Sequence, residues 1–242
     1  SPMPGEPSRS ANDLAMQAGG NVNNVGGVLK SGADATVKAA GDVNITASKT
    51  LDSGAIGNRS SFTTIAQQGS VVDAGRDLHV IAGRDISAIA SQVEAKRDVN
   101  LIATRDLNAI AAANEQHSTG NTKKVKSIED HVQQVSSVIK AGGDATLSAG
   151  QNLQLVASQV NAGNEAYLVS GKNLELKAAE NQDYSFYSKT KKTSQGKKFR
   201  LDETDVVNNV GSLVSAGTNS TVVAGADLLL AGSAVTAEKG AT

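Results

Sequence analysis

The 242-residue sequence contains no Cys and no Trp, and only three Tyr and three Phe. The lack of cysteine excludes a disulfide framework, a thiol nucleophile and a thiolate metal site. A globular core of this size normally buries many large rings, so the few aromatics argue against an ordinary globule. Ala, Val, Leu and Ile must fill the core, which we therefore expect to be narrow and built from small side chains.

Other absences narrow the class of protein further. The 23 Lys and Arg residues are balanced by 24 Asp and Glu, which gives a net charge of −1. A nucleic-acid-binding protein normally carries a basic excess, so no nucleic-acid partner is expected. No apolar run reaches the roughly 18 residues of a transmembrane helix. Residues 1–10 show neither the charged start nor the apolar stretch of a signal peptide, and we interpret them as a linker or cloning scar.

What the sequence does contain is an internal repeat. The segment Gly75–Ala95 matches Gly142–Ala162 and Gly217–Ala237 without a gap, and each copy ends in the closing motif small-Ser-x-aliphatic-x-Ala. With this motif as the boundary, the sequence divides into units that cover 11–31, 32–53, 54–74, 75–95, 96–141, 142–162, 163–216 and 217–237. Two of the eight units carry insertions, over about 113–136 and 180–210, and a ninth unit that starts at Glu238 suggests a piece of a longer protein. A fixed period of this kind is typical of solenoids.

Apolar residues alternate within each unit, which is the pattern of a β-strand. Leu78, Val80 and Ala82 should face one side, with His79 and Ile81 on the other. Gly-x-Asp or Gly-x-Asn separates the strands and favours turns. Three short strands per unit predict an all-β fold, a right-handed parallel β-helix with two extra-helical insertions. We expect one such domain over 11–242, in which each coil is stabilised by its neighbours.

The Gly-x-Asp positions form a column of acids that a calcium-binding β-roll would also show. The GGxGxD pattern of such rolls is absent, and Asn occupies several of the same positions. We therefore expect each Asp or Asn to cap its own turn. The preceding arginines should relieve repulsion between stacked carboxylates; they are Arg76, Arg84, Arg97 and Arg105.

No motif for catalysis is present. His79, His117 and His131 occur singly, without a second ligand at metal-binding spacing, and we expect exposed polar side chains. There is no nucleophile elbow and no phosphate-binding loop. A carbohydrate-active β-helix enzyme would need paired acids beside a groove, usually with aromatic platforms. The sequence predicts no enzyme, and it predicts no catalytic residue, metal site or cofactor.

The second insertion is the candidate interaction surface. It holds four of the six aromatic residues, interleaved with cations, as at binding hot spots and lipid headgroups. Alternation around Tyr184 and a Gln195–Gly196 turn predict a hairpin that leaves the rod, although the rings could instead cover one open side of the β-helix. The candidate residues are Tyr184, Phe186, Tyr187, Lys189, Lys191, Lys192, Lys197, Lys198, Phe199 and Arg200.

The units of the form GxDLxLxAGxDLxLxASxVxA resemble the haemagglutinin repeats of filamentous haemagglutinin-type exoproteins, which are exported by two-partner secretion. The mixture of regular coils and Lys-containing insertions looks most like the second haemagglutinin-repeat region of CdiA-type contact-dependent growth inhibition proteins. The resemblance covers Ala11 to Ala237. It carries no catalytic residues.

This resemblance implies an outer-membrane transporter as partner, and a secreted filament tethered to the outer membrane of a Gram-negative bacterium. It also implies a role in toxin delivery to a neighbouring cell, whose surface or outer membrane would be a second partner. An adhesin segment that binds host cells or surface glycans is the alternative. We expect a monomeric rod in either case.

Overall fold

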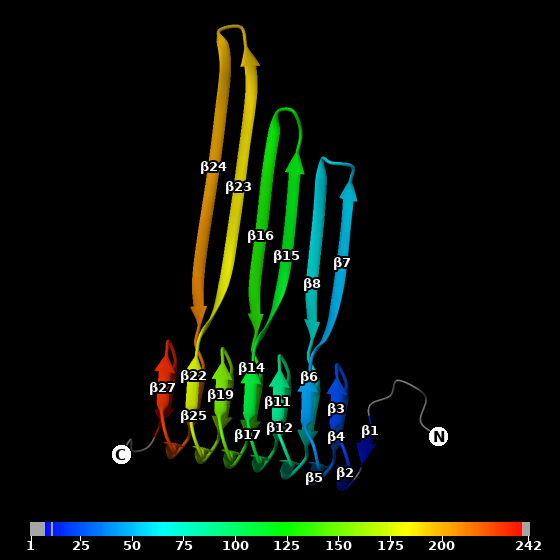
Figure 1. The fold of residues 1–242 in the computed structure, drawn as a ribbon, viewed down its shortest axis with the longest axis vertical. Helices are drawn as coiled ribbons and strands as arrows, with labels where there is room; N and C mark the ends of the chain where they lie inside the picture. Colours follow the sequence, from blue (N-terminus) through cyan, green and yellow to red (C-terminus); the bar gives the residue numbers. More distant parts are fainter. Residues whose placement is uncertain (1–7, 11, 239–242) are drawn as a thin grey trace.

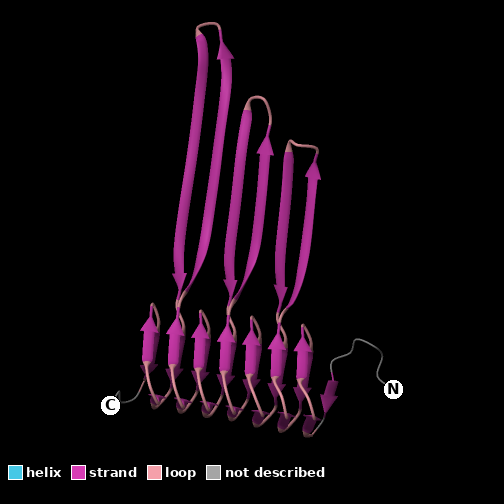
Figure 2. Cartoon of the chain, viewed as in Figure 1, coloured by secondary structure: helices cyan, strands magenta, loops and turns pink. Residues whose placement is uncertain are grey.

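A computed structural model describes residues 8–10 and 12–238 of the chain. Within these residues every regular element is a β-strand and there is no helix (Figure 2). Three parallel sheets run along the rod, and a fourth, antiparallel sheet stands on one side of it (Figure 1). The predicted all-β parallel β-helix is confirmed.

The three parallel sheets form the walls of the rod. Sheet A consists of β1 (Ser8–Ser10), β4 (Val28–Ser31), β9 (Val71–Ala74), β12 (Gln92–Ala95), β17 (Val138–Ala141), β20 (Gln159–Ala162), β25 (Leu213–Ala216) and β28 (Ala234–Ala237). Sheet B consists of β2 (Leu14–Ala18), β5 (Ala35–Ala39), β10 (Leu78–Ala82), β13 (Val99–Ala103), β18 (Ala145–Ala149), β21 (Ala166–Ser170) and β26 (Ser220–Ala224). Sheet C consists of β3 (Val22–Val25), β6 (Val43–Thr46), β11 (Ile86–Ile89), β14 (Leu107–Ile110), β19 (Leu153–Val156), β22 (Leu174–Lys177) and β27 (Leu228–Ala231).

Sheet D is built from three hairpins. Its strands are β7 (Ser48–Ile56), β8 (Ser60–Gln68), β15 (Ala112–Asn121), β16 (Val125–Val135), β23 (Ala179–Thr193) and β24 (Gly196–Val210). Each hairpin follows a strand of sheet C and returns to a strand of sheet A, as Figure 1 shows.

The core is a stack of equivalent aliphatic residues. On β10, Leu78, Val80 and Ala82 are each at most 1% exposed, and they pair in register with Val99, Leu101 and Ala103 of β13. His79 and Ile81 point the other way and are partly exposed, as the alternation predicts. Three sheet faces meet on one narrow axis, so the core accepts aliphatic and small side chains and leaves no room for rings.

A ladder of buried serines explains the closing motif. The N–H of Ser137 donates to the Oγ of Ser158 at 3.2 Å, and the N–H of Ser158 donates to the Oγ of Ser212 at 3.1 Å. Each hydroxyl also donates to a carbonyl in its own coil, as Ser158 does to Val156 at 2.9 Å. Buried polar groups are costly unless they are hydrogen-bonded. At each corner between sheets C and A, the serine hydroxyl therefore supplies an acceptor for the backbone N–H of the serine in the neighbouring coil.

The same serine contact closes the coil beneath each hairpin. Ser137 comes after β16 but donates to the carbonyl of Ile110, the last residue of β14, at 2.9 Å. Ser70 reaches Thr46 at 2.7 Å and Ser212 reaches Lys177 at 2.8 Å in the same way. A hairpin can thus be inserted at this corner without any change in the coil itself.

The predicted number of coils and insertions was wrong. Sheets B and C each hold seven strands in the described residues, so the rod has seven coils there and carries three hairpins. Units 32–53 and 54–74 form a single coil interrupted by β7 and β8. Val43 is paired with Ile86 on one side and with Val22 on the other, and the chain between Val43 and Ile86 is about twice as long as that between Val22 and Val43. The inserted hairpin is nearly one repeat long, which is why it resembled a coil.

The prediction for residues 1–10 also needs correction in part. Ser8–Ser10 form β1, which pairs in parallel with β4 and extends sheet A. Residues 1–7 lie outside the described residues.

Candidate functional site

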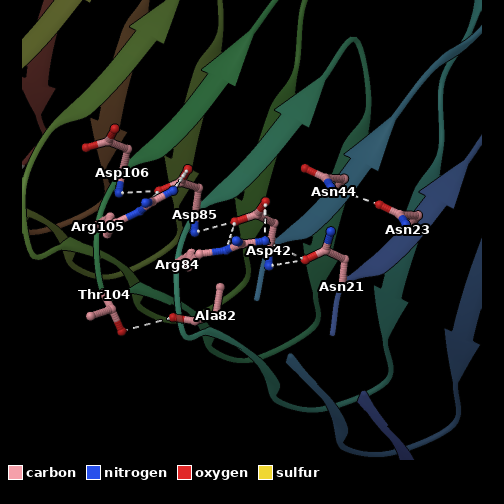
Figure 3. A network of polar contacts seen from close by, with 10 residues as sticks. All are labelled: Asn21, Asn23, Asp42, Asn44, Ala82, Arg84, Asp85, Thr104, Arg105 and Asp106. Atoms are coloured by element: carbon pink, nitrogen blue, oxygen red, sulfur yellow. Dashed lines mark hydrogen bonds and ion pairs between the residues drawn. The ribbon is translucent and has the colours of Figure 1, made fainter. Parts of the chain in front are cut away.

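The acidic column of the turns runs from coil to coil. Each side chain accepts a hydrogen bond from the backbone N–H of its equivalent in the next coil. Figure 3 shows one such column, in which the Oδ1 of Asn21 accepts from Asp42 at 2.8 Å and that of Asp42 accepts from Asp85 at 3.0 Å. The expected capping of each residue's own turn was therefore wrong. Asn can replace Asp because either side chain supplies the accepting oxygen.

Arginines pair with the carboxylates at both turns of the coil, as the sequence predicted. Arg105 donates to both carboxylate oxygens of Asp85 one coil back, at 3.1 and 2.9 Å, and Arg97 does the same to Asp77 (2.7 and 2.5 Å). These bonds hold the pKa of Asp77 and Asp85 below the usual range of a carboxyl. The described residues contain no group of three or more His, Asp or Glu side chains that could hold a metal ion. The columns are structural ladders along the rod.

The hairpins follow every second coil, and this spacing lets them form one sheet. Hairpins leave the rod after β6, β14 and β22, while β11 and β19 lead directly to sheet A. Strands in a sheet lie about 4.8 Å apart, so two strands of one hairpin fill the width of two coils. The result is the continuous order β24-β23-β16-β15-β8-β7.

Polar clasps join neighbouring hairpins at their bases. The N–H of Gln67 donates to the side chain of Asn114 at 2.7 Å, and the N–H of Gln134 donates to Asn181 at the same distance. Both glutamines also donate through Nε2 to the carbonyl of the residue before that asparagine. The two clasps are equivalent, and they fix the register between hairpins.

The predicted hairpin of the second insertion is β23–β24, which pairs over Ala179–Thr193 and Gly196–Val210. Its turn lies at Ser194 and Gln195, one residue earlier than expected. Gly196 has a φ of 129°, which few other residues adopt. The hairpin stands away from the rod (Figure 1), so its rings do not cover an open side of the β-helix.

The ten candidate residues divide between the two faces of sheet D. Opposite residues of an antiparallel pair share a face, and the register therefore assigns each one. The first face carries Tyr184, Phe186, Lys192, Lys197 and Phe199. The second face carries Tyr187, Lys189, Lys191, Lys198 and Arg200. Phe199 on β24 is 67% exposed, whereas Phe186 and Tyr187 on β23 are half-buried because they lie beside β16.

Two of these rings have polar partners on β24. The Tyr184 hydroxyl donates to Glu203 at 3.0 Å, and this bond raises the pKa of the phenol. Arg200 lies 5.8 Å from the centre of the Tyr187 ring, within reach of a cation–π contact. Arg200 also bonds Asp202 at 2.7 Å. The contacts of Tyr184 and Tyr187 link β23 to β24 below the tip of the hairpin.

Two histidines have acidic partners that the sequence did not reveal. His117 on β15 lies 2.8 Å from Asp130 across the hairpin and 3.0 Å from Glu115 on its own strand. Hydrogen bonds to Glu115 and Asp130 raise the pKa of the imidazole. His131 lies 2.7 Å from Asp183 on the neighbouring hairpin. The pairs with Asp130 and Asp183 depend on strand register, so only the folded sheet brings them together.

The fold and the site together define a class of protein. It is a parallel β-helical solenoid in which the same contacts repeat from coil to coil. The exposed side chains that do not follow the repeat lie mainly on the projecting sheet D. In the described residues no helix is long and apolar enough to cross a membrane.

The hemagglutinin repeat model matches residues 52–130 and 118–206, and the chain therefore belongs to the hemagglutinin repeat family. No curated protein and no solved structure matches the chain significantly. Each match to the family model starts in the outgoing strand of one hairpin and ends in the return strand of the next. The hairpins are thus part of the family repeat. Such repeats occur in secreted, surface-exposed filamentous proteins, and the family is structural and adhesin-type rather than enzymatic.

Proposed function

We propose that this segment is a monomeric stalk in a surface filament and that its hairpin sheet contacts another cell during contact-dependent toxin delivery. In this role the exoprotein would be exported through the outer-membrane transporter of a two-partner secretion system and stay tethered to the outer membrane. The repeat pattern, with its regular coils and Lys-containing hairpins, supports the choice of this system.

One observation carries the proposed contact surface. The β23–β24 hairpin projects furthest from the rod in Figure 1, and its tip is rich in cations with an exposed Phe199. The walls of the rod, in contrast, repeat the same ladders from coil to coil. A partner that recognises this segment has distinct side chains to contact mainly on sheet D.

Replacement of residues 181–209 by a short Gly-Ser turn tests this proposal. Because Ser212 closes the coil beneath the hairpin, the rod should keep its melting curve. The labelled variant should lose binding to Gram-negative cells in flow cytometry. The comparison variant replaces residues 49–67, the first hairpin, by the same turn. It removes fewer cations than the loss of 181–209 and should lose less binding.

If cell binding survives the loss of 181–209, or if the rod itself unfolds, the hairpin is scaffold and the proposal is wrong. The adhesin alternative predicts a different binding preference. An adhesin segment would bind host cells or immobilised surface glycans better than it binds bacterial cells, and the same hairpin variant shows whether this binding uses β23–β24.

A further inference from the structure

The tips of the three hairpins concentrate positive charge that the composition of the whole chain conceals. Residues 54–62, 118–128 and 188–201 contain ten Lys and Arg residues and no Asp or Glu. The rest of the chain then holds 13 basic and 24 acidic residues. The ten cations, which we call the cationic rim, are Arg59, Lys123, Lys124, Lys126, Lys189, Lys191, Lys192, Lys197, Lys198 and Arg200.

Exposed apolar side chains lie among these cations. Ile56 is 75% exposed beside the first turn, and Phe199 and Leu201 are 67% and 50% exposed near the third. Large apolar groups exposed beside lysines are typical of elements that lie at a lipid interface. A soluble polyanion would be attracted by the cations alone and would gain little from these side chains.

A depression lies near the tips of the first two hairpins and reaches the middle of β23 in the third. It has a volume of about 370 Å³, and its lining includes Ile128 and Phe186 together with the cations Arg59 and Lys126. Ser61 and Thr119, which bond each other at 2.7 Å, lie in the same lining. The depression therefore combines cations and hydroxyls, which suit the phosphate of a lipid headgroup, with apolar side chains, which suit the first part of an acyl chain.

We infer that the cationic rim is a docking surface for a lipid bilayer whose headgroups carry anionic phosphate. The lysines and arginines attract the phosphates, and Ile56, Phe199 and Leu201 enter the boundary between headgroups and acyl chains. The hairpins become longer from β7–β8 to β23–β24 (Figure 1), so a flat membrane that touches all three tips lies oblique to the rod. The inference rests on the proposed contact function of sheet D and names its partner.

Co-sedimentation of the whole chain with vesicles tests the inference. The chain should bind vesicles of phosphatidylcholine mixed with phosphatidylglycerol, bind pure phosphatidylcholine weakly, and lose binding as salt is added. The test variant carries Lys191→Gln, Lys192→Gln, Lys197→Gln and Lys198→Gln. Each cation near an anionic membrane contributes about a fivefold factor, so the variant should bind at least about a hundredfold more weakly.

The matched control removes the same charge from the coils, where Lys38, Lys96, Lys140 and Lys172 are exposed. Substitution of these four by Gln should leave vesicle binding unchanged. A Phe199→Ser variant should lose the fraction of binding that resists salt. Equal loss in both lysine variants overturns the inference, and so does binding to heparin without binding to vesicles.

The two proposals fail in distinguishable ways. If anionic vesicles are ignored while cells are still bound through residues 181–209, the partner is a receptor and the membrane inference is wrong. If cells are not bound at all, the proposed contact function is wrong.

Discussion

Leu155→Asp is expected to abolish the cooperative unfolding transition of the rod. Leu155 is fully buried on β19, and it pairs with Ala109 of the preceding coil and Leu176 of the following one. Truncation of a buried leucine costs about 2–5 kcal/mol, and an unpaired buried carboxylate costs still more. Since small domains are stable by only about 5–15 kcal/mol, this one change should unfold the central coils.

The loss should spread along the rod because each coil is stabilised by its neighbours. Urea unfolding followed by circular dichroism measures the effect. The matched control is Gln154→Asp on the same strand, whose side chain points outward and is partly exposed. A wild-type midpoint for Leu155→Asp, or an equal loss in both variants, would contradict the assigned strand faces.

Replacement of residues 113–134 by a Gly-Ser turn is expected to make the β23–β24 hairpin sensitive to trypsin. In the intact sheet, β23 pairs with β16 from Gln182 to Lys189. Without β15 and β16, the two remaining hairpins are separated by the width of two strands, about 10 Å more than a pairing distance allows. A two-stranded hairpin alone is marginally stable at best in water.

Trypsin should then cut first between Lys189 and Arg200, while the melting curve of the rod should remain close to that of the intact chain. Replacement of 49–67 serves as the control, because it leaves β16 beside β23. The middle hairpin would be shown to have no supporting role if all three proteins resisted trypsin equally.

The fold was largely predictable because it repeats. Aliphatic residues such as Leu78, Val80 and Ala82 recur at a fixed period, and burial in a narrow rod requires that pattern. The first hairpin was missed because its insertion exceeds one repeat by a single residue, so the closing motif recurs almost where a further coil would place it. Length alone could not separate an extra coil from an insertion of nearly the same size.

The sequence predicted which residue types the candidate surface contains, but not which side chains of sheet D bond to one another. The cations and rings of 184–200 stand out in an aromatic-poor chain. The cations and Phe199 lie near the hairpin tip, whereas Phe186 and Tyr187 are half-buried beside β16. The cross-strand partners of His117 and His131 lie 13 and 52 residues away, and only the register of sheet D brings them together. The turn carboxylates were misassigned for a similar reason, since their partners lie one coil away.

The most direct test of the architecture is a pair of cysteines in a chain that has none. Lys38 and Ile81 are paired neighbours on β5 and β10, and Ile81 and Ile102 are paired neighbours on β10 and β13. If the first hairpin leaves the rod, Lys38→Cys/Ile81→Cys should form a disulfide under mild oxidation as readily as Ile81→Cys/Ile102→Cys. Parallel neighbours lie about 4.8 Å apart, within disulfide reach. If residues 54–74 instead form a coil of their own, the first pair would lie two coils apart and should remain reduced while the second pair closes.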